Sequence, residues 1–208
     1  MVLKYVVVWT VDKDKAYSEK LLAKKVSRGR MSETQKAEIL GRIKATDSAD
    51  DLEGCDLVIE AVFEDSELKA RVTQEAEPKL VNNGIFASNT STIPITQLAE
   101  ASANAENFIG LHFFSPVDKM QLVEIIVGEK TSDETLARSF DYVQQIGKIP
   151  VVVNDSRGFF TSRVFGTFVN EGICMLGEGI HPSSIENAGL LAGMPVGPLA
   201  ISDEVSMT

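Results

Sequence analysis

The sequence predicts an α/β fold in which a mostly parallel sheet is followed by the start of an all-helical domain. Short runs rich in valine and isoleucine alternate with stretches of helical periodicity, as they do in α/β proteins. The runs are nearly continuous in apolar character, which suits strands covered on both faces. After Asn154 the alternation stops, and apolar residues recur at helical spacing.

The expected elements follow from these patterns in chain order. Six apolar runs are the expected strands, and they span residues 6–9, 56–62, 84–88, 108–113, 122–127 and 149–153. The charged stretch 13–44 indicates two helices that separate near residues 28–30, and Ser32 with Gln35 makes a capping box for the second. Further helices are expected over residues 66–81, after Pro94 and over residues 132–146, closed by Gly147.

A domain boundary is expected near residues 153–157. It separates a first domain, residues 1–155, from a helical domain, residues 156–208, with helices over 159–176 and from Ser183 onward. About fifty residues make only a marginal helical core. Apolar side chains of the first of these helices should therefore be poorly buried unless a second copy covers them, namely Phe159, Phe160, Val164, Phe165, Phe168 and Val169. This pattern predicts a homo-oligomer.

Composition and charge exclude several classes of function. Among the 208 residues, 30 acids against 20 bases give a formal net charge of −10, which argues against a nucleic-acid partner. No apolar run approaches the ~18 residues of a membrane span, and the N-terminus lacks the basic leader and cleavage site of a signal peptide. Cys55 and Cys174 lie outside any Cys-x-x-Cys spacing, which favours buried thiols over a metal site or a disulfide. We therefore expect a cytoplasmic protein without a metal.

His112 and Glu124 are the first candidates for catalytic chemistry. His112 ends an apolar strand, where α/β sheets place their ligands, and Glu124 lies in the next apolar run, where an unpaired carboxylate is costly. A return strand could bring the two side chains within about 2.6–3.2 Å. The carboxylate would fix the imidazole tautomer, and the other ring nitrogen would act as a general base or acid for a hydroxyl. The alternative is a core histidine bonded to the backbone beside a glutamate that reaches solvent.

A second candidate is the segment Ala87-Ser-Asn-Thr-Ser-Thr-Ile-Pro94, in which small polar residues come directly after an expected strand. Its hydroxyl and amide groups offer several donors for a substrate carbonyl or hydroxyl. Ser91 could equally be the N-cap of the helix after Pro94, because serine prefers caps. The sequence alone leaves both interpretations open.

Charged residues at two other places are also candidates. Glu60 lies inside an apolar run, and Glu64 and Lys69 stand at the strand-to-helix corner that follows. The alternative there is an acid on the helix dipole beside a solvated lysine. Arg28 shares one helical face with two lysines, which could meet a phosphorylated ligand or form a solvated face paired with acidic neighbours.

Taken together, these segments resemble the 3-hydroxyacyl-CoA dehydrogenase family, in particular the dehydrogenase part of bacterial multifunctional fatty-acid-oxidation α-subunits. The motifs Ser-Asn-Thr-Ser, Gly-Leu-His-Phe-Phe and Leu-Val-Glu-Ile are highly specific at this spacing. The resemblance covers nearly the whole chain from about Lys15 onward. The matching stretches are residues 56–65, 87–94, 110–116, 122–126, 154–163 and 193–204.

The resemblance implies a Rossmann-like sheet and the NAD-dependent oxidation of an (S)-3-hydroxyacyl-CoA to the 3-ketoacyl-CoA in fatty-acid β-oxidation. It implies that His112 is the catalytic base, with Glu124 as its carboxylate partner. Ser91 matches the serine that binds the substrate oxygen, and it also borders the cofactor. Glu64 and Lys69 match positions that contact NAD. Arg28 falls near the place where family members present a basic residue to the CoA.

The chain departs from the family pattern at three places. Ser115 stands where the family usually has an asparagine close to the nicotinamide. Ser162 stands at a substrate-binding position where the family commonly has an asparagine before the arginine of the first tail helix. The sequence has no Gly-x-Gly-x-x-Gly turn to cradle the pyrophosphate, and Tyr5 occupies the position of the ribose-binding acid. We therefore expect an incomplete version of the enzyme, without its first βα unit and most of its helical tail.

Two functions from different classes compete on this evidence. The first is a dehydrogenase, of which this chain is a fragment that is inactive alone. The second is a non-catalytic acyl-CoA-binding or interaction module of the same fold. The missing glycine turn favours the second for the chain as it stands, whereas the set of Ser91, His112 and Glu124 favours catalytic ancestry.

Overall fold

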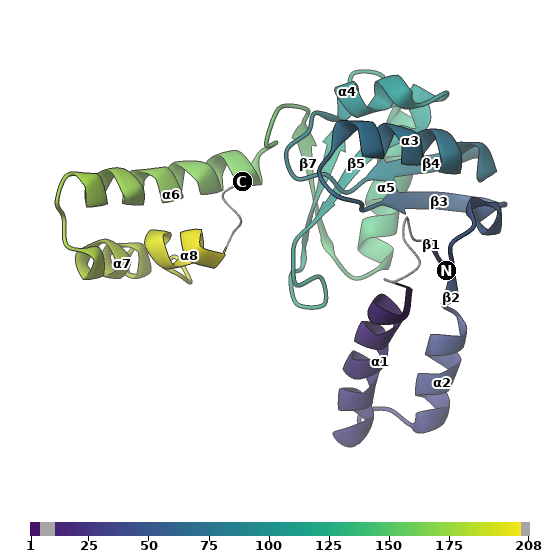
Figure 1. Ribbon diagram of the computed structural model, residues 1–208, viewed down its shortest axis with the longest axis horizontal. Helices are drawn as coiled ribbons and strands as arrows, with labels where there is room; N and C mark the ends of the chain where they lie inside the picture. The colour runs from purple at the N-terminus through teal and green to yellow at the C-terminus, as the bar shows by residue number, and fades with distance from the viewer. Residues whose placement is uncertain (5–10, 205–208) are drawn as a thin grey trace. The chain divides into compact units, whose positions relative to one another are not determined.

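The computed structural model describes residues 1–4 and 11–204, and it divides into two compact units. The first unit is Met1–Asp155 and the second is Ser156–Thr208. The strand expected over residues 6–9 lies outside the described residues. Figure 1 shows the elements of each unit, and the two units are described here one at a time.

A five-stranded, mostly parallel sheet is the centre of the first unit, as the sequence predicts. Its strands lie in chain order, and every neighbouring pair is parallel except β5 with β6, which is antiparallel. The strands are β3 (Cys55–Glu60), β4 (Leu80–Ser88), β5 (Phe108–Phe113), β6 (Leu122–Val127) and β7 (Ile149–Asn154).

Two short strands form a separate parallel pair, β1 (Val2–Lys4) with β2 (Lys44–Thr46). Three residues are too few to give a periodic signal, so neither strand stands out in the sequence. No ladder within the described residues joins this pair to β3.

The helices of the first unit agree with the expected ones apart from their ends. Ser32 and Gln35 form the predicted capping box at the start of α2, and α1 and α2 lie side by side (Figure 1). The helix expected over residues 66–81 ends at Ala76, and Pro78 lies in the short 3-10 turn that follows, where a missing N–H is tolerated. The helices are α1 (Val11–Ser27), α2 (Glu33–Gly41), α3 (Ser66–Ala76), α4 (Ile95–Leu98) and α5 (Asp133–Gln145).

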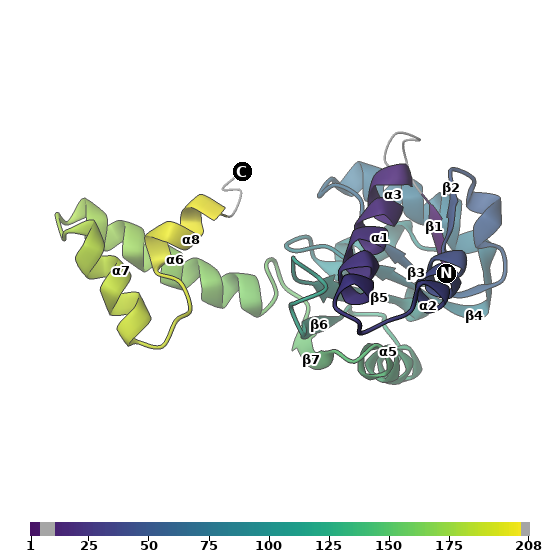
Figure 2. The ribbon, with the colours of Figure 1, turned by 90° about the horizontal axis from the view of Figure 1, so that it is seen from below.

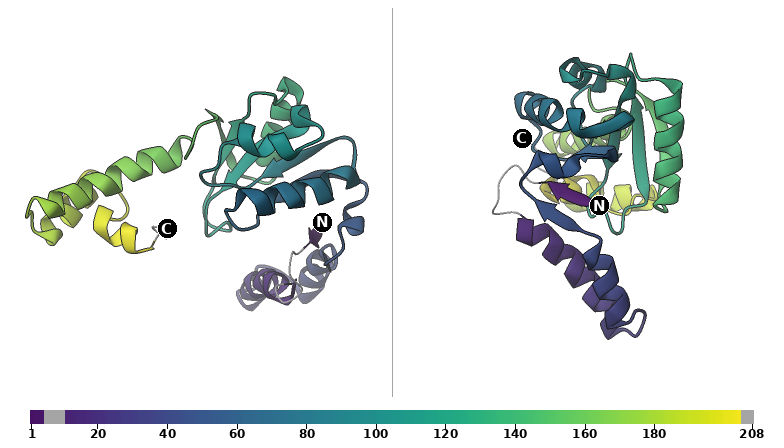
Figure 3. Two further views of the ribbon diagram at one scale, coloured as in Figure 1. Left: turned by 45° about the horizontal axis from the view of Figure 1, so that its top comes forward. Right: turned by 90° about the vertical axis from the view of Figure 1, so that its right-hand side faces the viewer.

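Helices cover both faces of the five-stranded sheet. Helices α3 and α4 lie on one face and α5 on the other (Figures 2 and 3). Gly110 on β5 allows α4 to pack closely, because a Cβ at this position would lie 2.7 Å from the Ile95 side chain. The core beneath α5 consists of Ile85, Ala87, Ile109, Leu111, Val123, Ile125 and Val143.

The second unit contains three helices among the described residues, α6 (Thr161–Gly177), α7 (Pro182–Leu191) and α8 (Pro198–Glu204). The expected poor burial of the apolar residues around the start of α6 is confirmed for Phe160 and Val164, which are 57% and 52% exposed, whereas Phe165 and Phe168 are half-buried. It is wrong for Phe159 and for Val169, which are buried. Val169 shares its helix face with Gly172, where an added Cβ would lie 2.6 Å from the Pro198 side chain, so α8 covers this face.

The part of the chain that the structure describes contains neither a helix that could span a membrane nor a cluster of side chains that could bind a metal ion. None of its helices combines the length and the apolar character that crossing a membrane requires. Its histidine, cysteine, aspartate and glutamate side chains nowhere form a group of three or more that could hold a metal ion.

Candidate active site

The His112 and Glu124 side chains are in direct contact across two neighbouring strands. His112 on β5 lies opposite Glu124 on β6 in the antiparallel ladder, so both side chains project from the same face of the sheet. The Nδ1–Oε2 distance is 2.8 Å. Glu124 is fully buried and His112 is 6% exposed. The predicted contact between these residues is confirmed. The alternative interpretation, in which the glutamate reaches solvent, is wrong.

This contact assigns the hydrogen atoms of the imidazole. A carboxylate oxygen only accepts, so the histidine Nδ1 carries the proton of the 2.8 Å bond. In the neutral ring the other nitrogen, Nε2, then has the lone pair that takes a proton. Once the ring is protonated, the buried carboxylate of Glu124 compensates the positive charge. An imidazole held in this way can perform general acid–base chemistry.

A buried ion pair lies at the carboxyl end of β3. The Lys69 ammonium from α3 is 2.9 Å from Glu60 Oε1 and donates to the Val62 carbonyl at 3.4 Å. Glu60 also accepts from the Ser88 hydroxyl at 2.7 Å. The side chains of Lys69 and Glu60 are each 1% exposed, so the interpretation of Lys69 as a solvated lysine is wrong. The sequence signal for this pair is a carboxylate within an apolar run.

The Glu64 carboxylate holds the polar loop after β4. Its Oε1 accepts from the Thr90 hydroxyl at 2.6 Å and from the backbone N–H groups of Ser91 and Thr92, both at 2.9 Å. Its Oε2 lies 3.5 Å from the Lys69 ammonium. Partial burial raises the pKa of Glu64, but the bonds from Thr90 and Thr92, the charge of Lys69 and the bond from Ser91 outweigh it, so this pKa lies below its ordinary value.

Ser91 is not the N-cap of the following helix. The cap position of α4 is Pro94, and the carboxylate of Asp155 accepts from the N–H groups of Ile95 and Thr96, both at 2.8 Å. The backbone of Ser91 is instead held by Glu64, at the carboxyl edge of the sheet near the end of β4. The N-cap interpretation of Ser91 is therefore wrong.

The loop between β5 and β6 carries Ser115 and is held from two other elements. The Lys148 ammonium, just before β7, donates to the backbone carbonyls of Val117 and Met120, both at 2.7 Å. The Tyr17 hydroxyl on α1 donates to Asp118 at 2.7 Å, which raises the pKa of Tyr17. Ser115 is exposed within this fixed loop. Neither Lys148 nor Tyr17 gave a signal in the sequence.

The other predicted site residues lie apart from this cluster or in the second unit. Arg28 is exposed just after the end of α1, on the hairpin formed by α1 and α2. Ser162 lies in the first turn of α6.

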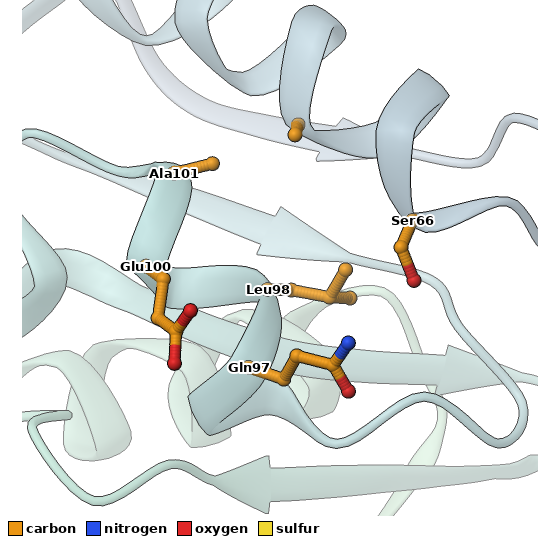
Figure 4. A pocket seen from close by; sticks show the side chains of 6 residues that line it. Ser66, Gln97, Leu98, Glu100 and Ala101 are labelled. Atoms are coloured by element: carbon orange, nitrogen blue, oxygen red, sulfur yellow. The ribbon is translucent and has the colours of Figure 1, made fainter.

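An open hollow of about 270 Å³ lies between α3 and the segment around α4, and it is lined by Ser66, Ala70, Gln97, Leu98, Glu100 and Ala101 (Figure 4). None of the predicted site residues lines it.

Comparison with known proteins accounts for both units. Residues 8–156 match the NAD-binding domain of 3-hydroxyacyl-CoA dehydrogenase, and residues 158–208 match its C-terminal domain. The chain belongs to the 3-hydroxyacyl-CoA dehydrogenase family. NAD is thus the cofactor of the matched domain.

Relatives and solved structures extend this result. The fatty acid oxidation complex subunit alpha of Shewanella loihica is 41% identical over 92% of the chain, which spans 27% of that relative's length. The (S)-3-hydroxybutyryl-CoA dehydrogenase from Ralstonia eutropha is 40% identical, with a TM-score of 0.92 over 98% of this chain and 72% of that one. The 3-hydroxybutyryl-CoA dehydrogenase from Escherichia coli K12 is 30% identical, with a TM-score of 0.90 over 97% and 43% of the two chains.

Proposed function

We propose that this chain carries the acid–base centre of an NAD-dependent oxidation of (S)-3-hydroxyacyl-CoA to 3-ketoacyl-CoA in fatty-acid β-oxidation. The observation that carries the proposal is the bond of 2.8 Å between His112 and the fully buried Glu124. A non-catalytic module of the same fold has no need for a buried carboxylate paired with an imidazole. The names of the relatives, a fatty acid oxidation subunit and two hydroxybutyryl-CoA dehydrogenases, also favour the catalytic function.

The proposed mechanism assigns the proton to His112. Nε2 takes the proton of the substrate's 3-hydroxyl while Nδ1 keeps its bond to Glu124, and the C3–H electron pair leaves as hydride so that the C3–O bond becomes a carbonyl. Ser91 donates a hydrogen bond to the same substrate oxygen. In the reverse direction the imidazolium returns its proton to the alkoxide oxygen. General acid–base assistance of this kind is worth about 10²–10⁴-fold.

The residues of this chain fit the nicotinamide end of NAD. Glu64, Ser91 and Ser115 lie in the loops that follow β3, β4 and β5, where open α/β sheets bind their ligands, and Lys69 supplies a positive charge against Glu64. NAD, when bound, accepts the hydride. The pyrophosphate end is different, because the 208 residues contain no Gly-x-Gly-x-x-Gly turn.

We assign the acyl-CoA partner to two further positions, and we infer the other partners and the compartment from charge, surface and cysteines. Arg28 on the helical hairpin addresses the CoA phosphates, and Ser162 on α6 addresses the substrate. The charge of −10 disfavours nucleic acid as a partner. The apolar surface of the second unit supports a homo-oligomer, and the two cysteines without a disulfide support the cytoplasm as the compartment. The expectation that both thiols are buried is wrong, because Cys174 is exposed and Cys55 is half-buried.

A fusion tests the proposed function. A family member's Gly-x-Gly-x-x-Gly βα unit is placed before Met1, and NADH-dependent reduction of acetoacetyl-CoA is measured from the absorbance of NADH. We expect reduction by the fusion and its loss, by about 10²–10⁴-fold, in His112→Gln. The matched control is His181→Gln, which changes the only other histidine. A folded fusion that binds NADH but reduces no 3-ketoacyl-CoA would contradict the proposal.

A further inference from the structure

The strand that carries His112 extends beyond its parallel neighbour. The ladder between β4 and β5 has three pairs and ends at Ser88 opposite Gly110. Strand β5 continues to Phe113, so His112 lies two residues past the last pair. A backbone N–H in such a partly buried position needs an acceptor, and the β4 backbone no longer supplies one.

The side chain of Asn89 supplies the acceptor at this point. Its Oδ1 accepts from the backbone N–H of Phe113 at 2.8 Å. Its own backbone N–H donates to the carbonyl of Glu60 at 2.7 Å. Asn89 therefore joins the ends of β3, β4 and β5 at the edge of the sheet where the candidate site residues lie.

We propose that Asn89 is a positioning residue for His112. The N–H that it binds belongs to the peptide unit joining His112 to Phe113, so the bond fixes the plane of that peptide. On the opposite side of β5, the antiparallel ladder sets Glu124 against His112. Holding the strand from both sides aims the imidazole at the carboxylate. The proposal rests on the proposed function in assigning a catalytic purpose to that aim, whereas the positioning itself is independent of activity.

Three variants of Asn89 separate positioning from simple space filling. Asn89→Leu keeps the branched shape and the number of heavy atoms of the side chain and removes the acceptor. Asn89→Asp keeps an acceptor oxygen at the same place in the side chain and should rescue the bond. Asn89→Ser is too short to reach the Phe113 N–H and disturbs packing least. Asn82→Leu is the matched control, because Asn82 lies exposed on β4, the strand that Asn89 directly follows.

The experiment is nitrogen-15 NMR on the 208-residue chain, with two readouts. Amide exchange reports the bond to the Phe113 N–H. The ring nitrogens of His112, assigned against His181→Gln, report which nitrogen carries the proton when the imidazole is neutral. In the native chain we expect the proton on Nδ1. In Asn89→Leu we expect the Phe113 amide to exchange about tenfold faster and the ring to populate both tautomers. Asn89→Asp should restore the amide protection, and Asn82→Leu should change neither readout.

Unchanged Phe113 exchange and an unchanged His112 tautomer in a folded Asn89→Leu chain would overturn the proposal. If that variant does not fold, Asn89→Ser decides, because native values of both readouts in it would overturn the proposal equally. Faster exchange without a change of tautomer would also overturn it, since Asn89 would then stabilise the strand without aiming the ring. Failure of the proposed function is distinct from these outcomes and would be seen as an inactive fusion with native NMR readouts.

Discussion

Glu60 and Lys69 form an ion pair in which the ammonium lies 2.9 Å from the carboxylate and each side chain is 1% exposed. The pair joins the end of β3 to α3, and Lys69 also faces Glu64, which holds the loop of Ser91. Charges this deeply buried lose much of their hydration. Each of them therefore destabilises the fold if its partner is removed. The corner that the sequence marks by three charged residues is thus one connected network.

Removing one partner of this pair should destabilise the fold strongly. Lys69→Met leaves the Glu60 carboxylate buried without its counter-charge, and we expect the free energy of unfolding to fall by about 3–5 kcal/mol. Urea denaturation followed by circular dichroism measures it. Glu60→Leu combined with Lys69→Met should recover a large part of the loss, because no unpaired charge remains.

Lys79→Met is the matched control for this prediction. Lys79 pairs with Asp50 at the surface, where water and salt screen the interaction. Its loss should therefore change stability far less than the loss of Lys69. Equal decreases in the free energy of unfolding for Lys69→Met and Lys79→Met would contradict the prediction, because the buried pair would then stabilise the fold no more than the surface pair.

The stabilisation that Glu64 provides by binding the Ser91 loop should decrease as the pH falls. The folded-state pKa of Glu64 lies below its ordinary value of 4.5, so its stabilising effect is complete above that value and is lost as the pH falls through the lower, folded-state pKa. The difference in thermal stability between the native chain and Glu64→Gln should be constant near pH 7 and should shrink on acidification to about pH 3. A difference that grows on acidification would contradict this assignment.

Glu124→Gln should preserve the fold yet lower turnover in the fusion. The glutamine amide can still accept from Nδ1, but it lacks the charge that compensates the imidazolium. We expect a decrease in turnover within the range of about 10²–10⁴-fold, with a native circular dichroism spectrum. Unchanged turnover would show that the pair has no catalytic role.

Much of the first unit could be predicted from the sequence because its signals are local. Apolar strand runs located β5 and β6 to the residue, and the buried position of Glu124 in such a run correctly predicted its contact with His112. The capping box of Ser32 was equally visible. In each case residues close in the sequence, or one hairpin apart, determine the outcome.

Contacts over long sequence distances could not be predicted in the same way. The side chain of Asn89 accepts from the Phe113 N–H, that of Lys148 donates to the β5–β6 loop, and that of Asp155 accepts from the first turn of α4. Each contact joins a side chain to backbone groups that the fold brings together, and backbone groups have no residue-specific signature. The burial of Phe159 and Val169 likewise depends on packing that the helical pattern of one segment does not specify.

The second unit should associate with another copy. Leu190 and Leu191 at the end of α7 are 50% and 88% exposed, and Met194 follows them in the sequence. Apolar surface of this kind promotes association. Sedimentation of the chain should show a concentration-dependent oligomer, and Leu191→Glu should shift it towards the monomer. Phe63→Glu, which changes an exposed aromatic residue in the first unit, is the control and should leave association unchanged. A compact monomer at high concentration would contradict the prediction.

The 208-residue chain should bind NAD very weakly and transfer hydride at a negligible rate. Pyrophosphate recognition depends on the N–H groups of a glycine turn and on the positive end of the following helix, and the sequence contains no Gly-x-Gly-x-x-Gly turn. Tyr5 also stands at the position where the family pattern has the ribose-binding acid. The remaining contacts that we propose, from Glu64, Lys69 and Ser91, would address the periphery and the nicotinamide end of the cofactor.

The expected weakness follows from the energy of the missing contacts. Hydrogen bonds to a charged group contribute about 1.5–3 kcal/mol each, so the loss of several lowers the affinity by orders of magnitude. Calorimetric titration with NAD measures it, and the fusion with the glycine-turn unit is the matched control, in which tight binding should return. A micromolar Kd for the 208-residue chain itself would overturn the prediction, because Glu64, Lys69 and Ser91 would then have to hold the cofactor without a pyrophosphate cradle.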